Sequence, residues 1–230
     1  MDALFKTYGR LLADTDLSFT RYLYDKINWN NRLIVIKGAK GVGKTTMLLQ
    51  HIKRTFTDQQ KALYVSLDNI WFANHTLLDL AEYHYTHGGT HLFLDEVHKY
   101  KGWEQEIKNI YDSYPRLHVV VTGSSMLKLE ESMAADLSRR HRSYTMEGLS
   151  FREYLQVEQV ADLPVLSLET ILKNHFKEAS KITSKVKVLH HFEKYLESGY
   201  YPFYREEGDG FFDRLQQVIN TVVTTEIPAV

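Results

Sequence analysis

The sequence predicts an α/β fold in which a mostly parallel sheet is flanked by helices and followed by a smaller helical region. The first observation is a series of short apolar runs between residues 32 and 123, rich in β-branched and aromatic residues and without alternation. Such runs are typical of strands that are buried on both faces. The second is that helical patterns separate these runs, which predicts right-handed βαβ crossovers. The third is that only helical patterns follow Ser150.

The predicted elements can be placed by residue number. Four strands are expected, over residues 32–36, 62–67, 91–96 and 118–123. The clearest helix between them carries large side chains on one face, at Trp103, Ile107, Ile110, Tyr111 and Tyr114. Two helical stretches precede the first strand, one with a stripe of Leu4, Leu11 and Leu12 and one over residues 19–27. We expect a core domain over residues 1–150 and a helical region over residues 151–230.

The composition is that of an ordinary globular protein, with 43% hydrophobic and 25% charged residues. The formal net charge of −1 gives no general attraction to nucleic acid or to anionic lipid, so strong nucleic-acid binding is not expected. The chain has no cysteine, which excludes disulfides and cysteine-ligated zinc and suits a reducing compartment. Because no secretory signal and no apolar stretch of about 18 residues is present, a cytoplasmic protein without a membrane span is expected.

Residues 38–45 match the pattern G-x-x-x-x-G-K-[ST] at every fixed position. Glycines at these positions let successive backbone N–H groups wrap a phosphate, and the helix that follows adds its amino-terminal dipole. Because an apolar strand precedes the loop and an amphipathic helix follows it, a phosphate site is favoured over a glycine-rich turn with a chance lysine. The expected nucleotide-binding residues are Gly38, Ala39, Lys40, Gly41, Val42, Gly43, Lys44, Thr45 and Thr46.

Two carboxylates, Asp95 and Glu96, end the third predicted strand. In a phosphate-binding protein Asp95 and Thr45 are expected to hold Mg²⁺, while Glu96 orients and polarises the attacking water. A small-molecule kinase needs no such water-activating carboxylate, so the pair favours hydrolysis over phosphoryl transfer to an alcohol. The alternative is that both residues cap a strand or a helix.

Polar residues also follow the fourth predicted strand, at Thr122, Ser124 and Ser125. A hydroxyl at this position can contact the attacking water or the γ-phosphate. The same hydroxyls can instead cap the helical pattern that follows, and both interpretations stay open.

Arginines and histidines give two further candidates. Arg139, Arg140 and Arg142 lie between the fourth strand and the helical region, where an arginine from the same or a neighbouring subunit can stabilise the charge on a γ-phosphate. The alternative is a solvated basic loop. Four histidines make zinc binding conceivable, namely His84, His87, His91 and His98. However, no carboxylate lies at a helical interval from them that would complete a convincing zinc site.

In combination these motifs resemble a prokaryotic family of AAA+-like ATPases. The resemblance is carried by "GAKGVGKTT", "YVSLDN", "LFLDEVHKYKGWEQEIKNIYD", "VVVTGSS" and "LSFREYL" in this order. It implies an ASCE-type P-loop core with sheet order 5-1-4-3-2, a helical lid, and a nuclease-like carboxyl-terminal domain that is expected to be absent here. The chain departs from the family by lacking the glycine before the arginine, and by Ala39 and Lys40 in place of the common proline and arginine.

The resemblance assigns catalytic roles to Lys44, Glu96, Thr122, Ser124 and Arg140. The expected function is Mg²⁺-dependent ATP binding and slow hydrolysis, used as a conformational switch for a protein partner or a further domain. Assembly into a homo-oligomer is compatible with this function. The alternative is a nucleotide-gated binding module with little or no hydrolysis. A small-molecule kinase is a third interpretation, against which Glu96 argues.

Overall fold

The structure is a computed structural model of the chain that describes residues 1–124, 137 and 139–226. It forms two compact units, one of Met1–Met146 with Val218–Val230 and one of Glu147–Gln217. The domain limits expected from the sequence, 1–150 and 151–230, stay a prediction.

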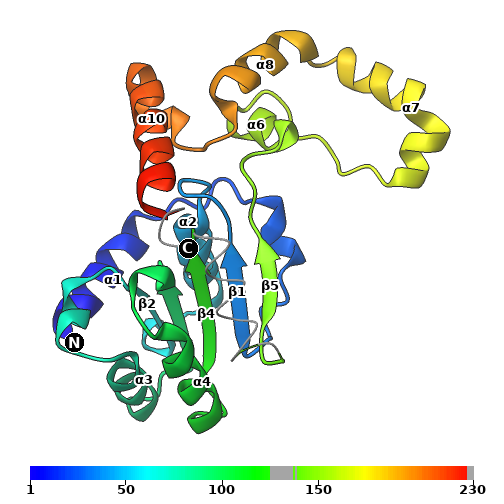
Figure 1. Cartoon of the computed structure of the whole chain (residues 1–230). Helices are drawn as coiled ribbons and strands as arrows, with labels where there is room; N and C mark the ends of the chain where they lie inside the picture. Colours follow the sequence, from blue (N-terminus) through cyan, green and yellow to red (C-terminus); the bar gives the residue numbers. More distant parts are fainter. Residues whose placement is uncertain (125–136, 138, 227–230) are drawn as a thin grey trace. The chain divides into compact units, whose positions relative to one another are not determined.

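The first unit is built on a five-stranded sheet (Figure 1). Its strands are β1 (Leu33–Lys37), β2 (Ala62–Ser66), β3 (His91–Asp95), β4 (His118–Gly123) and β5 (Arg142–Thr145). All neighbouring strands pair in parallel, in the order β2-β3-β4-β1-β5. The predicted order 5-1-4-3-2 is therefore confirmed, and all carboxyl ends of the strands lie at one edge.

Strand β5 begins at Arg142, the last of the three arginines for which a solvated basic loop was the alternative interpretation. Among the described strands it pairs with β1 alone, and its four residues are exposed or half-buried. An edge strand with little burial needs no apolar run, which explains why Arg-Ser-Tyr-Thr gave no strand signal.

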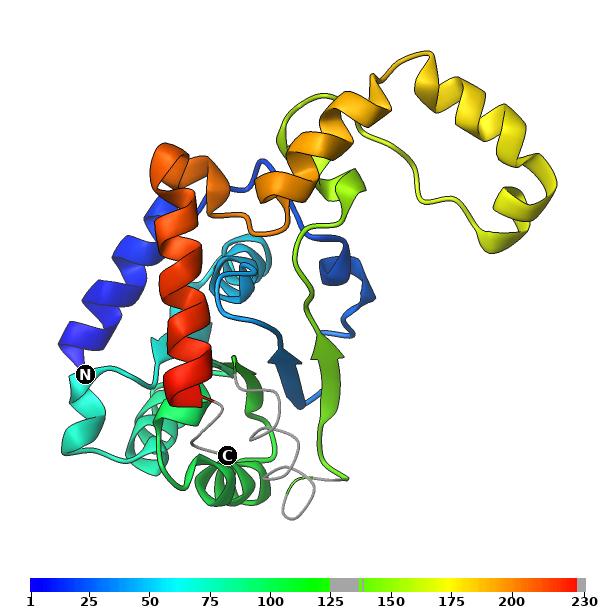
Figure 2. The same ribbon diagram turned by 45° about the horizontal axis from the view of Figure 1, so that its top comes forward.

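Helices connect and flank the strands of the first unit. They are α1 (Asp2–Asp14), α2 (Lys44–Thr55), α3 (Leu77–Thr86) and α4 (Trp103–Ser113). Short 3₁₀ turns add η1 (Tyr22–Lys26), η2 (Gln59–Lys61), η3 (Ile70–Ala73) and η4 (Val97–Lys99); of the helix expected over residues 19–27, only η1 forms. Right-handed crossovers place α2 on one face of the sheet and α3 and α4 on the other, as Figures 1 and 2 show. Helix α1 packs on α2, and α3 packs on α4.

The core of this unit contains aromatic and histidine side chains beside the apolar strands. His84 is 2% exposed, and its Nε2–H donates to the carbonyl of His91 (3.0 Å). The ring of His51 is stacked on Trp29, with ring centroids 3.8 Å apart. Burial lowers the pKa of His51, His84 and His91 to about 4, and mutual repulsion between neighbouring histidines contributes for His51 and His91.

The second unit, whose residues 147–217 are all described, contains helices joined by turns and coil, and no strand. Its helices include α6 (Phe151–Val157), α7 (Leu168–Thr183), α8 (Val188–Lys194), the π-helical turn η5 (Tyr195–Gly199) and α9 (Tyr204–Glu207). A 3₁₀ turn η6 (Gly208–Gly210) then leads to α10 (Phe211–Thr221), which begins in this unit and ends in the first. The π-helical turn η7 (Val222–Glu226) belongs to the first unit. Helix α6 begins at a capping box of Ser150 and Glu153, and its Tyr154 and Leu155 form a small core with Val186.

The buried histidines predict a loss of stability in acid. Their pKa values are lower in the folded than in the unfolded state, so unfolding takes up protons as the pH falls from about 6.5 to about 4. Each group then contributes up to about 1.4 kcal/mol per pH unit. His84→Gln keeps an N–H donor for the carbonyl of His91 but cannot become charged, so its loss of stability between about pH 7 and pH 5 should be smaller than that of the wild type.

Urea unfolding at both pH values measures this difference. His175→Gln, at an exposed position on α7, is the matched control and should behave like the wild type. Equal pH dependence in His84→Gln and His175→Gln would show that folding does not lower the pKa of His84.

Candidate functional site

The loop between β1 and α2 has a backbone that only glycine adopts easily. Gly41 (φ 86°) and Gly43 (φ 96°) lie in the left-handed region, and α2 begins directly after Gly43. A Cβ atom on Gly38 would lie 2.1 Å from the carbonyl oxygen of Met146. Two glycines are thus required by conformation and one by close packing. The resulting concave backbone at a helix amino terminus suits a phosphate group.

Two buried cations are tied to this loop. The ammonium of Lys44 (5% exposed) donates to the carbonyls of Gly38 (2.7 Å) and Ala39 (2.9 Å). The guanidinium of Arg21, also 5% exposed, donates to the carbonyl of Val42 (2.5 Å). Arg21 was not predicted as a site residue, because it lies upstream of the loop and belongs to no motif. The other predicted loop residues with exposed side chains or backbone are Ala39, Lys40, Gly41 and Thr46.

The centre of the site is the carboxylate of Asp95, which is 2% exposed at the end of β3. Its Oδ2 accepts hydrogen bonds from the hydroxyls of Thr45 (2.5 Å) and Tyr64 (2.9 Å). Its Oδ1 accepts from the hydroxyl of Thr122 and from the backbone N–H of Glu96 (3.0 Å). Four donors from the helix α2, two neighbouring strands and the following turn therefore converge on one side chain.

The sheet register explains this convergence. Ser66 on β2 is aligned with Asp95 on β3, and Thr122 on β4 is aligned with Ile36 at the end of β1. Since the strands are parallel, these residues share one edge with the loop. Tyr64 was not predicted as a site residue because a tyrosine inside an apolar strand is indistinguishable from a core aromatic.

Glu96 follows Asp95 in an unusual backbone conformation. Its φ of 54° is left-handed, which is uncommon for a residue with a side chain and turns the chain sharply at the end of β3. Burial, followed by repulsion from Asp95, raises the pKa of the Glu96 carboxyl group, against the opposing attraction of Lys44 and Lys40. A carboxylate with a raised pKa is better able to accept a proton from water.

Ser124 and His98 lie next to Glu96. The Nε2 atom of His98 is 3.4 Å from Oε2 of Glu96 and 3.2 Å from Oγ of Ser124. Ser125 and the helical pattern expected after it lie outside the described residues, so the capping interpretation of these hydroxyls stays a prediction.

Arg140 is not brought together with these residues within the chain. Its guanidinium donates from Nε and from a terminal nitrogen to the two carboxylate oxygens of Asp112, each at 3.2 Å. Asp112 lies in the last turn of α4, which leads into the amino-terminal end of β4. Arg140 therefore lies at the edge of the sheet opposite to the loop.

The zinc interpretation finds no support. Within the part of the chain that the structure describes, no group of three or more histidine, aspartate or glutamate side chains could hold a metal ion. The N–H of His84 is occupied by the carbonyl of His91. The same described residues include no helix long and apolar enough to cross a membrane.

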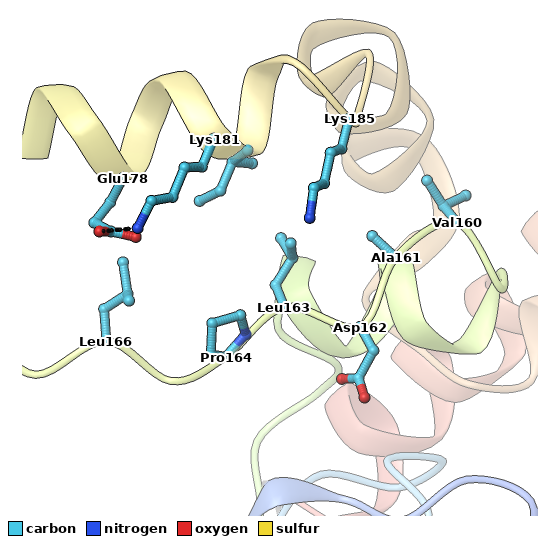
Figure 3. Close-up of a pocket in the computed structure, with 10 residues that line it drawn as sticks. Val160, Ala161, Asp162, Leu163, Pro164, Leu166, Glu178, Lys181 and Lys185 are labelled. Carbon is cyan, nitrogen blue, oxygen red and sulfur yellow. Dashed lines mark hydrogen bonds and ion pairs between the residues drawn. The ribbon is translucent and has the colours of Figure 1, made fainter.

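A pocket of about 460 Å³ lies in the second unit (Figure 3). It is lined by the segment 160–166, whose lining side chains are apolar except for Asp162, and by residues 178–185 at the end of α7. There Lys181 forms an ion pair with Glu178 (2.6 Å). Lys181 and Lys185 are exposed. The pocket contains none of the predicted site residues.

The phosphate loop after β1, the acidic pair after β3 and the strand order define a P-loop ATPase domain of the AAA+-like class. A family model described as an AAA domain matches residues 30–155, which is more than half of the chain. The chain belongs to this AAA domain family.

A curated relative is an uncharacterized protein of Methanocaldococcus jannaschii, 30% identical over 235 residues. The match covers 96% of this chain and 49% of the relative, so the chain spans about half the length of that protein.

Three solved structures share the general arrangement at low similarity. Caenorhabditis elegans PCH-2 is 16% identical with a TM-score of 0.40, covering 71% of this chain and 49% of PCH-2. Saccharomyces cerevisiae Hsp104, in a casein complex, is 18% identical with a TM-score of 0.46, and the match covers 66% of this chain and 31% of the Hsp104 chain. AMPPCP-bound DnaA from Aquifex aeolicus is 15% identical with a TM-score of 0.44, and the match covers 92% of this chain and 65% of the DnaA chain. Similarity at this level carries no functional inference.

The hydrogen bond from Tyr64 to Asp95 predicts a cost for losing one hydroxyl. Tyr64→Phe should lower the free energy of unfolding by about 1.5–3 kcal/mol, because it removes a donor from a buried carboxylate. Tyr8→Phe is the matched control, since the buried Tyr8 hydroxyl has no hydrogen-bond partner among the described residues. It should be neutral or slightly stabilising. Urea unfolding measures the change in the free energy of unfolding for both variants. Equal changes in Tyr64→Phe and Tyr8→Phe would contradict a specific role for the Tyr64 hydroxyl.

Proposed function

We propose that this chain binds Mg²⁺ and ATP and hydrolyses ATP slowly, as a conformational switch for a protein partner or a further domain. The observation that carries the proposal is the convergence of Thr45, Thr122 and the Glu96 N–H on the buried carboxylate of Asp95. It joins the phosphate loop to the acidic strand end and to the polar strand end, the three parts that nucleoside-triphosphate hydrolysis needs.

The loop residues fit a triphosphate and its cation. The backbone N–H groups of the loop from Gly41 to Thr45 and the ammonium of Lys44 would hold the phosphates, in place of the two carbonyls that Lys44 now contacts. Thr45 and Asp95 would hold Mg²⁺, because the hydrogen bond from Thr45 to Asp95 leaves the hydroxyl oxygen's lone pairs for the cation. When bound, Mg²⁺ supplies positive charge to the phosphate oxygens.

Glu96 is proposed to orient the attacking water. As the water oxygen forms its bond to the γ-phosphorus, the bond to the β–γ bridging oxygen breaks and a water proton moves toward the Glu96 carboxylate. The raised pKa of Glu96 supports this role. Thr122 donates to Asp95, so we assign it to fixing that carboxylate, while Ser124 is the hydroxyl proposed to contact the γ-phosphate.

A nucleotide-gated binding module without turnover is the second candidate. It is favoured by one observation, the pairing of Arg140 with Asp112 at the opposite edge of the sheet. An arginine that acts on the γ-phosphate would then have to come from a neighbouring subunit, and an isolated chain would bind nucleotide with little hydrolysis.

Substitutions in the loop and at Glu96 separate the two candidates. Wild-type protein with Mg·ATP at 100 times its dissociation constant should gain about 2.7 kcal/mol of stability, seen as a higher melting temperature. Lys44→Ala should lose this shift, whereas Lys173→Ala, at an exposed position on α7, should keep it. A wild-type shift in Lys44→Ala would rule out the loop as the site. Glu96→Gln should keep the shift and lose turnover; a wild type with the shift but without turnover would favour the binding module.

Arg140 provides a test of action between subunits. If it stabilises the γ-phosphate charge of a neighbour, Arg140→Ala should lower turnover by about 10³- to 10⁵-fold and affect ATP affinity far less. The turnover per molecule of the wild type should also rise with protein concentration over a hundredfold range. Arg139→Ala, at the exposed neighbouring position, is the control and should match the wild type. Turnover that is unchanged in Arg140→Ala at every concentration would leave Arg140 a surface partner of Asp112.

A further inference from the structure

We infer that His98 is a positioning residue that links the carboxylate of Glu96 to the hydroxyl of Ser124, so that the three side chains act as one unit. This inference rests on the proposed ATPase function and extends it to a residue that the family motifs do not assign. It begins from the position of the imidazole ring, which is held in the turn directly after Glu96.

The turn that carries His98 is fixed by its backbone. Glu96, in the left-handed conformation, begins the 3₁₀ turn η4, and its carbonyl accepts from the N–H of Lys99 (2.9 Å). Tyr100 N–H then donates to the carbonyl of Val97 (3.0 Å), and the Val97 side chain is fully buried. The His98 side chain is only 5% exposed as a result. An imidazole with so little freedom can hold its neighbours in a defined geometry.

One nitrogen atom of this ring faces both partners. Nε2 of His98 lies 3.4 Å from Oε2 of Glu96 and 3.2 Å from Oγ of Ser124. Ser124 is itself buried, at 7% exposure, and Glu96 is the more open side chain at 24%. The ring therefore lies between the proposed water-orienting carboxylate and the hydroxyl proposed to contact the γ-phosphate.

The chemistry of a neutral imidazole makes these two contacts depend on each other. If Nε2 carries the proton, its N–H is shared between the Glu96 carboxylate and the Ser124 oxygen, and the Ser124 hydroxyl keeps its own proton for another acceptor. If Nε2 is unprotonated, it accepts from Ser124 and presents a lone pair to Glu96, which is repulsive. Only the first arrangement holds the carboxylate in place while Ser124 donates to a phosphate oxygen. A change at Ser124 is thereby communicated to Glu96 through a single atom.

Turnover measurements test this link with four variants. His98→Leu removes both the donor and the acceptor, whereas His98→Gln keeps an amide donor and acceptor of similar reach. His98→Leu should lower kcat by about tenfold to hundredfold, the scale of a misplaced catalytic group, with ATP affinity unchanged. His98→Gln should recover part of this loss. Ser124→Ala should cost much less in the His98→Leu background than in the wild type, because linked residues are non-additive.

The outcomes distinguish this inference from the proposed function. Suppose that the wild type turns over ATP and Glu96→Gln does not, as the proposed function requires. Then a normal kcat in His98→Leu would overturn the role of His98 and leave the proposed function standing. Independent effects of His98→Leu and Ser124→Ala, whose fold-changes in kcat simply multiply in the double variant, would do the same. If the wild type shows no turnover at all, the proposed hydrolysis fails and the positioning role of His98 in it fails as well. Urea unfolding establishes whether each variant is folded. If His98→Leu is not folded, the kcat of His98→Gln is used for the comparison instead.

A spectroscopic measurement tests the contact without turnover. In protein with ¹⁵N-labelled histidine, the ring signals of His98 are identified by their loss in His98→Gln. The Nε2 signal should have the shift of a protonated nitrogen, and both Glu96→Gln and Ser124→Ala should move it. An Nε2 signal that neither substitution moves would overturn the inference, since the ring would then serve packing alone.

Discussion

The carboxylate of Asp95 is the point on which the candidate site depends. It is buried at the end of a central strand, and such a group is tolerated only when hydrogen bonds satisfy its oxygens. Four donors do so, from α2, β2, β4 and the turn after β3. Each donor is consequently held in a fixed place relative to the others. The same bonds that make the buried charge acceptable assemble the proposed catalytic groups.

Parts of this arrangement could be predicted because they are encoded locally. The loop glycines, Lys44 and Thr45 follow a fixed spacing after an apolar strand, and Asp95 and Glu96 directly end another. The parallel sheet then follows from buried apolar runs, and parallel order brings these strand ends to one edge. No long-range information was needed for either step.

Other parts could not be predicted because their partners are distant in the sequence. Arg21 reaches a carbonyl of the loop from a segment without a motif, and Tyr64 has the pattern of a core aromatic until its hydroxyl is seen on Asp95. His98 could be grouped with other histidines, but not with Ser124, which arrives from a different strand. Strand β5 has no apolar signal because it is an edge strand.

The close approach of Gly38 and Met146 constrains the chain at the boundary of the first unit. Met146 N–H donates to the carbonyl of Lys37 (2.7 Å), and its own carbonyl occupies the space where any side chain at position 38 would have to be. Met146 is also the last residue before the second unit begins. A side chain at position 38 would therefore collide with backbone atoms, which cannot move aside as the end of a flexible side chain could. The chain thus leaves its first unit at a residue whose carbonyl is packed against the first glycine of the phosphate loop.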